Sequence, residues 1–114
     1  MVFGYKATTV SGFPVFSLLG DLIDRGQAKE LMAEVDKNIA DGKVKFVFQF
    51  EKLKYINSSG LGIIITLFTR ARKNGGEIVI CCVNDKVKEL LVITKLNTVF
   101  TVTKSLETAL LKLK

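Results

Sequence analysis

The stretch that decides the fold reads Tyr55-Ile56-Asn57-Ser58-Ser59-Gly60-Leu61-Gly62. It lies between an alternating apolar run, residues 44–50, and a helical apolar block that comprises Leu61, Ile64, Ile65 and Phe68. Asn and Ser oxygens commonly accept hydrogen bonds from the N–H groups that the first helical turn leaves without partners. The stretch therefore predicts a polar, capped corner at which a strand ends and a helix begins.

The two glycines of this stretch are not explained by capping. Gly60 and Gly62 fall in the first helical turn, where each glycine weakens a helix by about 1 kcal/mol relative to alanine. Glycine is tolerated at such positions where another backbone or a partner must come close. The corner is no phosphate loop, because no Gly-Lys-Ser/Thr follows, and Thr66 interrupts the dinucleotide pattern. A bare helix N-terminus can still bind an anion, so weak nucleotide binding stays open.

Strand and helix patterns alternate on both sides of the corner. In the run 44–50 one face carries Val44, Phe46, Phe48 and Phe50, whereas Lys45 and Gln49 lie on the other. This alternation predicts a sheet that helices cover mainly on one face, with Phe46, Phe48 and Ile80 in the core. Further strands are expected over residues 2–10, 13–19, 77–83 and 98–103, with Gly20-Asp21 ending the second one.

Helices are predicted from caps and apolar spacing. Asp24 is the candidate cap of a first helix, which Gly42 ends, and the corner itself begins a second helix that runs to about Lys73. Asn84 or Asp85 begins a third, and Ser105 caps a last one. The sequence predicts a single α/β domain over residues 1–114, with a mostly parallel mixed sheet of about five strands and about four helices mainly on one face.

Composition limits the classes of function. The net charge of +6 is scattered along the chain and not clustered among aromatics, which argues against a nucleic-acid partner. The most apolar run, residues 61–68, is far shorter than the roughly 20 residues of a membrane helix, and no signal-peptide pattern opens the sequence. We therefore expect a cytoplasmic protein with no membrane association.

The cysteine pair and the absence of histidine bear on catalysis and metals. Cys81 and Cys82 are adjacent in a strand-like run, so we expect them on opposite faces, in the core and free of disulfide and zinc. Without histidine no Ser-His or Cys-His dyad is possible. Asp21, Asp24 and Glu51 show no pairing that would make them catalytic acids. We expect a non-enzyme without cofactor or metal.

The central stretch resembles a known phosphorylation motif. Residues 55–62 are similar to the Asp-Ser-Ser/Thr-Gly-Leu-Gly motif of bacterial anti-sigma factor antagonists, members of the STAS-domain family. The resemblance covers essentially the whole chain. Its further parts are Gly20-Asp21-Leu22, Asn74-Gly75-Gly76-Glu77-Ile78-Val79, Val87-Lys88-Glu89-Leu90-Leu91 and Thr94-Lys95-Leu96.

The resemblance implies a switch that works by binding. A member of this family binds an anti-sigma factor, often a serine kinase, and so releases a sigma factor; the kinase phosphorylates the antagonist and breaks the complex, and a phosphatase resets it. On this chain the resemblance makes Ser58 the phosphorylated residue and implies a monomer or weak dimer. The partner-binding residues it implies are Asp21, Ile23, Asp24, Asn57, Ser58, Ser59, Gly60 and Leu61.

The chain departs from the motif at two positions. Asn57 stands where the family usually has Asp, and Ile23 stands where many members have an Asp. Two other functions therefore stay open: a non-phosphorylated STAS module that serves as a subunit of a transport or signalling assembly, and a weak nucleotide-binding protein.

Overall fold

The alternating patterns fold into one mixed sheet with helices on both faces. The computed structural model describes residues 2–114. Within this range the sheet has five strands in the order β1-β2-β3-β4-β5, of which β1 and β2 are antiparallel and the other neighbours parallel. The strands are β1 (Gly4–Val10), β2 (Phe13–Leu22), β3 (Lys45–Ile56), β4 (Glu77–Cys81) and β5 (Thr101–Thr103). The predicted fold class is confirmed.

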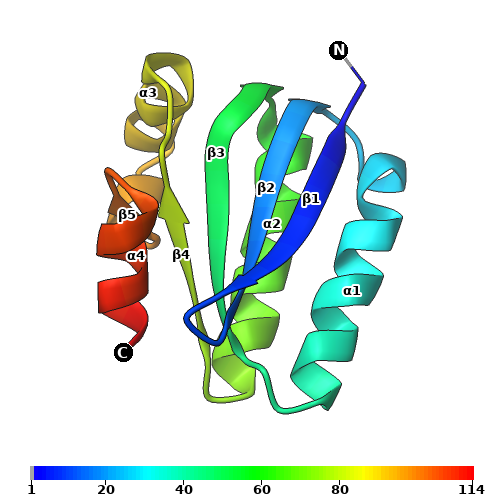
Figure 1. The fold of residues 1–114 in the computed structure, drawn as a ribbon. Helices are drawn as coiled ribbons and strands as arrows, with labels where there is room; N and C mark the ends of the chain where they lie inside the picture. Colours follow the sequence, from blue (N-terminus) through cyan, green and yellow to red (C-terminus); the bar gives the residue numbers. More distant parts are fainter. Residues whose placement is uncertain (1) are drawn as a thin grey trace.

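Helices connect the parallel strands. The α-helices in the described range are α1 (Lys29–Ala40), α2 (Ser58–Lys73), α3 (Asp85–Ile93) and α4 (Leu106–Leu113), and the 3-10 turns are η1 (Arg25–Ala28) and η2 (Leu96–Thr98). Figure 1 shows α1 and α2 side by side behind the sheet and α4 in front of it. Crossovers between neighbouring parallel strands have one hand, so the connecting helices fall on the same face.

The main core lies between the sheet and α1, α2 and α3. Phe46, Phe48 and Ile80 are completely buried in it, as the period-2 pattern predicts. In α2 the buried side chains include Ile63 and Ile64, whereas Ile65 is exposed. Ile65 belongs to the apolar block of the sequence but not to the core: two adjacent isoleucines precede it, and 3.6-residue periodicity turns the third away.

The helices lie mainly on one face, as predicted, and α4 is the exception. This helix packs Ala109, Leu110 and Leu113 against the opposite face, where Val47 is completely buried. Because α4 follows the last strand and connects nothing, the crossover rule does not fix its side. Lys45 and Gln49 do face away from the main core; Lys45 is exposed and donates a hydrogen bond to the carbonyl oxygen of Leu113 at 3.2 Å.

Two strands are longer than their sequence patterns indicate. β2 continues through Gly20 and Asp21 to Leu22, although its register against β3 shifts there. β3 continues past Phe50 to Ile56, paired with the end of β2. The predicted break at Gly20-Asp21 was wrong, because ladder pairing with β3 holds a segment whose residue types alone disfavour a strand. β5, in contrast, keeps only the end of its predicted range.

The two cysteines do not lie on opposite faces. Cys82 follows the last residue of β4 and has φ = 64°, in the left-handed region. Its Sγ atom is 3.2 Å from that of Cys81, and both residues contact the cluster under α4. Both are free thiols; Cys81 is buried and Cys82 half-buried. The period-2 expectation fails here because the strand ends between them.

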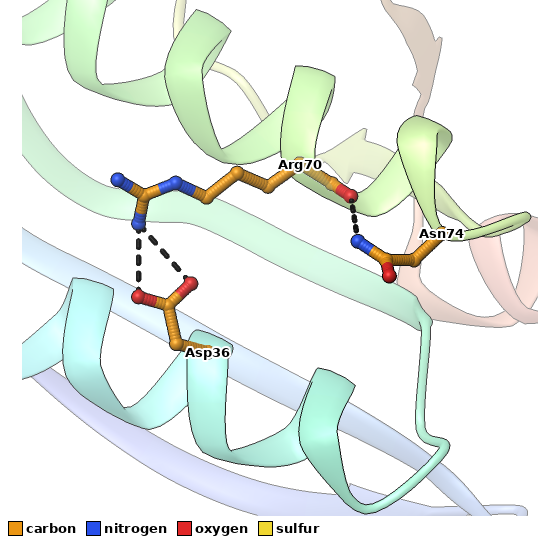
Figure 2. A network of polar contacts seen from close by, with 3 residues as sticks. All are labelled: Asp36, Arg70 and Asn74. Carbon is orange, nitrogen blue, oxygen red and sulfur yellow. Dashed lines mark hydrogen bonds and ion pairs between the residues drawn. The ribbon is translucent and has the colours of Figure 1, made fainter.

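A surface ion pair links α1 to α2. Arg70 Nη1 contacts both carboxylate oxygens of Asp36 at 3.1 and 3.0 Å, and Asn74 donates to the carbonyl oxygen of Arg70 at 2.8 Å (Figure 2). Exposed pairs of this kind contribute up to about 1 kcal/mol. The apolar contacts beneath them therefore hold the two helices in place.

Replacing Lys95 by glycine should stabilise the domain. Lys95 lies two residues after the end of α3 and directly before η2, with its backbone in the left-handed region at φ = 62°. Its side chain is exposed. That conformation costs a non-glycine residue roughly 1–2 kcal/mol, part of which the extra freedom of glycine in the unfolded chain offsets. We expect Lys95→Gly to raise the free energy of unfolding by about 1 kcal/mol in a urea titration. Lys95→Ala, which removes only the exposed side chain, should leave it unchanged; a similar gain in both variants would contradict the strain argument.

Candidate functional site

The corner after β3 is built around the side chain of Asn57. Its Oδ1 accepts a hydrogen bond from Gly60 N at 2.9 Å and thereby caps α2. Its Nδ2 donates to the carbonyl oxygen of Ile23 at 3.1 Å, which ties the corner to the loop after β2. An aspartate could cap the helix but could not donate to Ile23. The amide thus performs two tasks at the position where the family usually has Asp.

Gly60 lets α2 pass directly over the end of β2. A Cβ atom on Gly60 would lie 2.3 Å from the carbonyl oxygen of Leu22 and 2.7 Å from Cγ1 of Ile56. Gly62, two residues further along α2, faces open space: a Cβ atom there would have nothing within 4 Å. Hence the two glycines of the motif differ: packing requires the first, whereas the second has room for a side chain.

Ser58 lies at the first position of α2 and is exposed, as is Ser59. Because Asn57 supplies the cap, the Ser58 hydroxyl has no structural task there; among the described residues it has no side-chain hydrogen-bond partner. The first turn of a helix presents unpaired N–H groups and the positive end of the helix dipole. A hydroxyl at this position is therefore accessible, and its surroundings favour an added negative charge.

The loop after β2 brings the other predicted residues next to the corner. Ile23 is 42% exposed and Asp24 is exposed, whereas Asp21 is half-buried within β2. Gln27 Oε1 accepts from the backbone N–H groups of Ile23 and Asp24 at 2.9 and 3.1 Å, and Asp24 accepts from Gly26 N at 2.7 Å. This capping box fixes the loop beside Asn57.

Not all residues assigned to partner binding lie on the surface. Leu61 is only 3% exposed and packs in the main core, and Gly60 is buried beneath the corner. These two residues can shape the surface from below, while the exposed part consists of Ile23, Asp24, Ser58 and Ser59 with half-buried Asn57.

A groove beside Ser58 was not predicted from the sequence. It has a volume of about 360 Å³ and runs between the end of β3 and α3. Its apolar lining includes Tyr55, 54% exposed, and Ile93, 72% exposed. One feature of the sequence could have indicated this groove: Ile93 is apolar but lies off the buried stripe of α3, which Val87 and Leu91 form. The full lining is Lys54, Tyr55, Ile56, Asn57, Ser58, Lys86, Val87, Glu89, Leu90 and Ile93.

The described residues offer neither a metal-binding cluster nor a membrane-spanning helix. Across residues 2–114 no group of three or more His, Cys, Asp or Glu side chains is arranged to hold a metal ion. None of the helices described is both long and apolar enough to cross a bilayer.

Removing the Asn57 side chain should loosen the corner. Asn57→Ala loses the cap of α2, typically about 1 kcal/mol, and the hydrogen bond to Ile23, about another 1 kcal/mol. We expect chemical denaturation to show a loss of about 2 kcal/mol. Asn57→Asp, which keeps the cap and loses only the donor, should fall between this variant and wild type. If Asn57→Ala were as stable as wild type, Asn57 would not organise the corner.

The chain is similar in sequence to STAS domains and to one curated bacterial protein. A family model described as the STAS domain matches residues 5–109. A Bordetella bronchiseptica protein named as a candidate anti-sigma factor antagonist, BtrV, is 28% identical over 100 residues, which cover 88% of this chain and 85% of the relative.

Solved structures have the same fold. An anti-sigma factor antagonist from Mycobacterium paratuberculosis superposes with a TM-score of 0.81 at 21% identity, covering 97% of this chain and 93% of that one. The Bacillus cell fate determinant SpoIIAA, in its phosphorylated form, gives a TM-score of 0.74 at 17% identity and covers 97% and 100%. The family match over almost the entire chain, together with this fold, shows that the chain belongs to the STAS domain family.

Proposed function

We propose that this protein is an anti-sigma factor antagonist. It binds an anti-sigma factor that is a serine kinase and thereby releases a sigma factor, and phosphorylation of Ser58 ends the complex. The observation that carries this proposal is the division of labour at the corner: Asn57 caps α2, while the neighbouring Ser58 is exposed and without a structural task. The named relatives support the same role.

The partner surface in this proposal consists of the exposed corner and the loop after β2. Ile23 supplies an apolar contact, and Asp24 and Ser59 supply polar ones. Gly60 and Leu61 hold this surface in place from beneath, and Asp21 lies half-buried near the end of β2. Because the capping box and the Asn57 hydrogen bonds fix the backbone, little conformational freedom is lost on binding, which favours affinity.

Phosphorylation changes binding and leaves the fold intact. A phosphate adds about −1.5 to −2 charges, and at a helix N-terminus the dipole accommodates negative charge at a gain of about 0.3–1 kcal/mol. The same charge in a packed interface loses its water without gaining a partner, which costs far more. SpoIIAA, which shares the fold, has been solved both phosphorylated and unphosphorylated, which is consistent with a fold that tolerates the modification.

In this role the protein is a regulator and not an enzyme. The kinase activity belongs to the partner, and a serine phosphatase would restore the hydroxyl. The protein itself would act in the cytoplasm, as a monomer or weak dimer, where sigma factors meet RNA polymerase.

Phosphorylation by the natural partner tests the function directly. The protein, immobilised, is used to recover its partner from a lysate of the source organism, and the recovered complex is incubated with ATP. We expect a mass increase of one phosphoryl group, located at Ser58 by peptide fragmentation, and release of the partner. Ser58→Ala should recover the same partner, gain no phosphate and retain the complex. Recovery of a membrane transporter subunit without phosphorylation would instead support a structural STAS module.

A further inference from the structure

The carboxyl end of β4 holds two thiols in direct contact. The Sγ atoms of Cys81 and Cys82 are 3.2 Å apart. Adjacent residues of a regular strand point to opposite faces, so their sulfur atoms would not meet. They meet here because Cys82 adopts φ = 64°, which turns its side chain towards the cluster that contains Cys81.

The backbone at Cys82 adopts a conformation that disfavours non-glycine residues. Glycine would occupy the left-handed region without strain, yet a cysteine stands there, and Cys82 N donates to the carbonyl oxygen of Thr103 at 3.3 Å. Strained residues of this kind concentrate at functional sites. The result of the strain is a vicinal dithiol with one half-buried and one buried sulfur.

The chemistry of this dithiol restricts what it can bind. A disulfide is disfavoured, because adjacent Cα atoms are closer together than the separation that a relaxed disulfide spans. Structural zinc requires four ligands, and residues 2–114 supply no such group. Burial, followed by the hydrogen bond with Cys82, raises the pKa of the Cys81 thiol. A suitable ligand is therefore soft and binds two sulfurs that lie only 3.2 Å apart.

We infer that Cys81 and Cys82 form a chelating site for trivalent arsenicals. Trivalent arsenic is soft and pyramidal, and it forms stable bonds with two sulfurs that lie close together. With phenylarsine oxide the arsenic–oxygen bond and both S–H bonds break, two As–S bonds form, and one water leaves. Arsenic stays trivalent, so no electrons are transferred. Half-buried Cys82 forms the first bond, and buried Cys81 closes the ring.

Titration of the reduced full-length protein with phenylarsine oxide tests the site. Intact-mass measurement should show one adduct per chain, with both thiols lost to a thiol reagent and regained on adding a small dithiol. Cys82→Ser, which keeps the residue size, should bind at least about a hundredfold more weakly, because the second As–S bond forms at a high effective concentration. Cys81→Ala should show the same loss of affinity. This second variant keeps the test valid if Cys82→Ser folds poorly.

A melting experiment ensures that the folded site is the one measured. The unfolded chain carries the same two thiols, so binding alone does not test the geometry. A ligand that prefers the native state raises the melting temperature. The expected rise is about 10 °C when the free ligand concentration is roughly a hundred times the dissociation constant. The inference is overturned if phenylarsine oxide lowers the melting temperature of wild type, or if Cys82→Ser binds as tightly as wild type.

Discussion

Ser58→Asp should lower the affinity for the anti-sigma factor by about a hundredfold or more while the domain stays folded. The aspartate lies at the first position of α2, where an acid is favourable in the free protein. In the complex its charge would be buried without a partner, which costs about 3–5 kcal/mol, and each 1.4 kcal/mol or so is a factor of ten. The measurement is a calorimetric titration of each variant against the purified partner.

Matched variants separate charge from packing. Ser58→Ala removes a hydroxyl that caps nothing, so the variant should bind the partner like wild type. Its free energy of unfolding should lie within about 0.5 kcal/mol of the wild-type value. Ser59→Asp adds the same charge one residue further along the exposed turn and tests how sharply the effect is localised. Equal affinity of Ser58→Asp and wild type would refute the switch, and unfolding of Ser58→Ala would make the residue structural.

Gly60→Ala should destabilise the domain by about 3 kcal/mol or more. The added methyl group would lie 2.3 Å from the Leu22 carbonyl oxygen, which is backbone at the end of β2 and cannot move aside alone. Either α2 must shift or the corner must open, and both break the hydrogen bond between Asn57 and Gly60. Urea denaturation of the variant measures the loss.

Gly62→Ala is the matched control, because it makes the same substitution two residues later in the same helix. Nothing lies within 4 Å of the added methyl group, so the variant should gain the helix propensity of alanine, about 1 kcal/mol. If Gly62 keeps the surface flat for the partner, the stabilised variant should bind the anti-sigma factor more weakly. Destabilisation by both substitutions to the same extent would contradict the distinction between them.

The corner could be predicted from the sequence because its determinants are local. A cap, a glycine and an apolar stripe act on residues within a few positions, so residues 55–62 indicate a strand end and a helix start without the rest of the chain. The alternation in residues 44–50 likewise placed Phe46 and Phe48 in the core. That Asn57 and not Ser58 is the cap could not be read from the sequence, since both residue types cap well.

What only the tertiary structure decided depends on contacts between distant residues. Ladder pairing extends β2 through Gly20-Asp21 and β3 to Ile56 against local preference. The crossover rule does not apply to the terminal helix α4, because this helix connects no strands. Its apolar residues pack against the opposite face of the sheet, at Val47. The bond from Asn57 to Ile23 joins residues 34 apart, and the end of β4 turns Cys82 towards Cys81. The sequence by itself determined which elements form and where the corner lies. The lengths of the strands, the side of α4 and the meeting of the two sulfurs depended on the fold, because the energies that set them arise only when separate elements pack together.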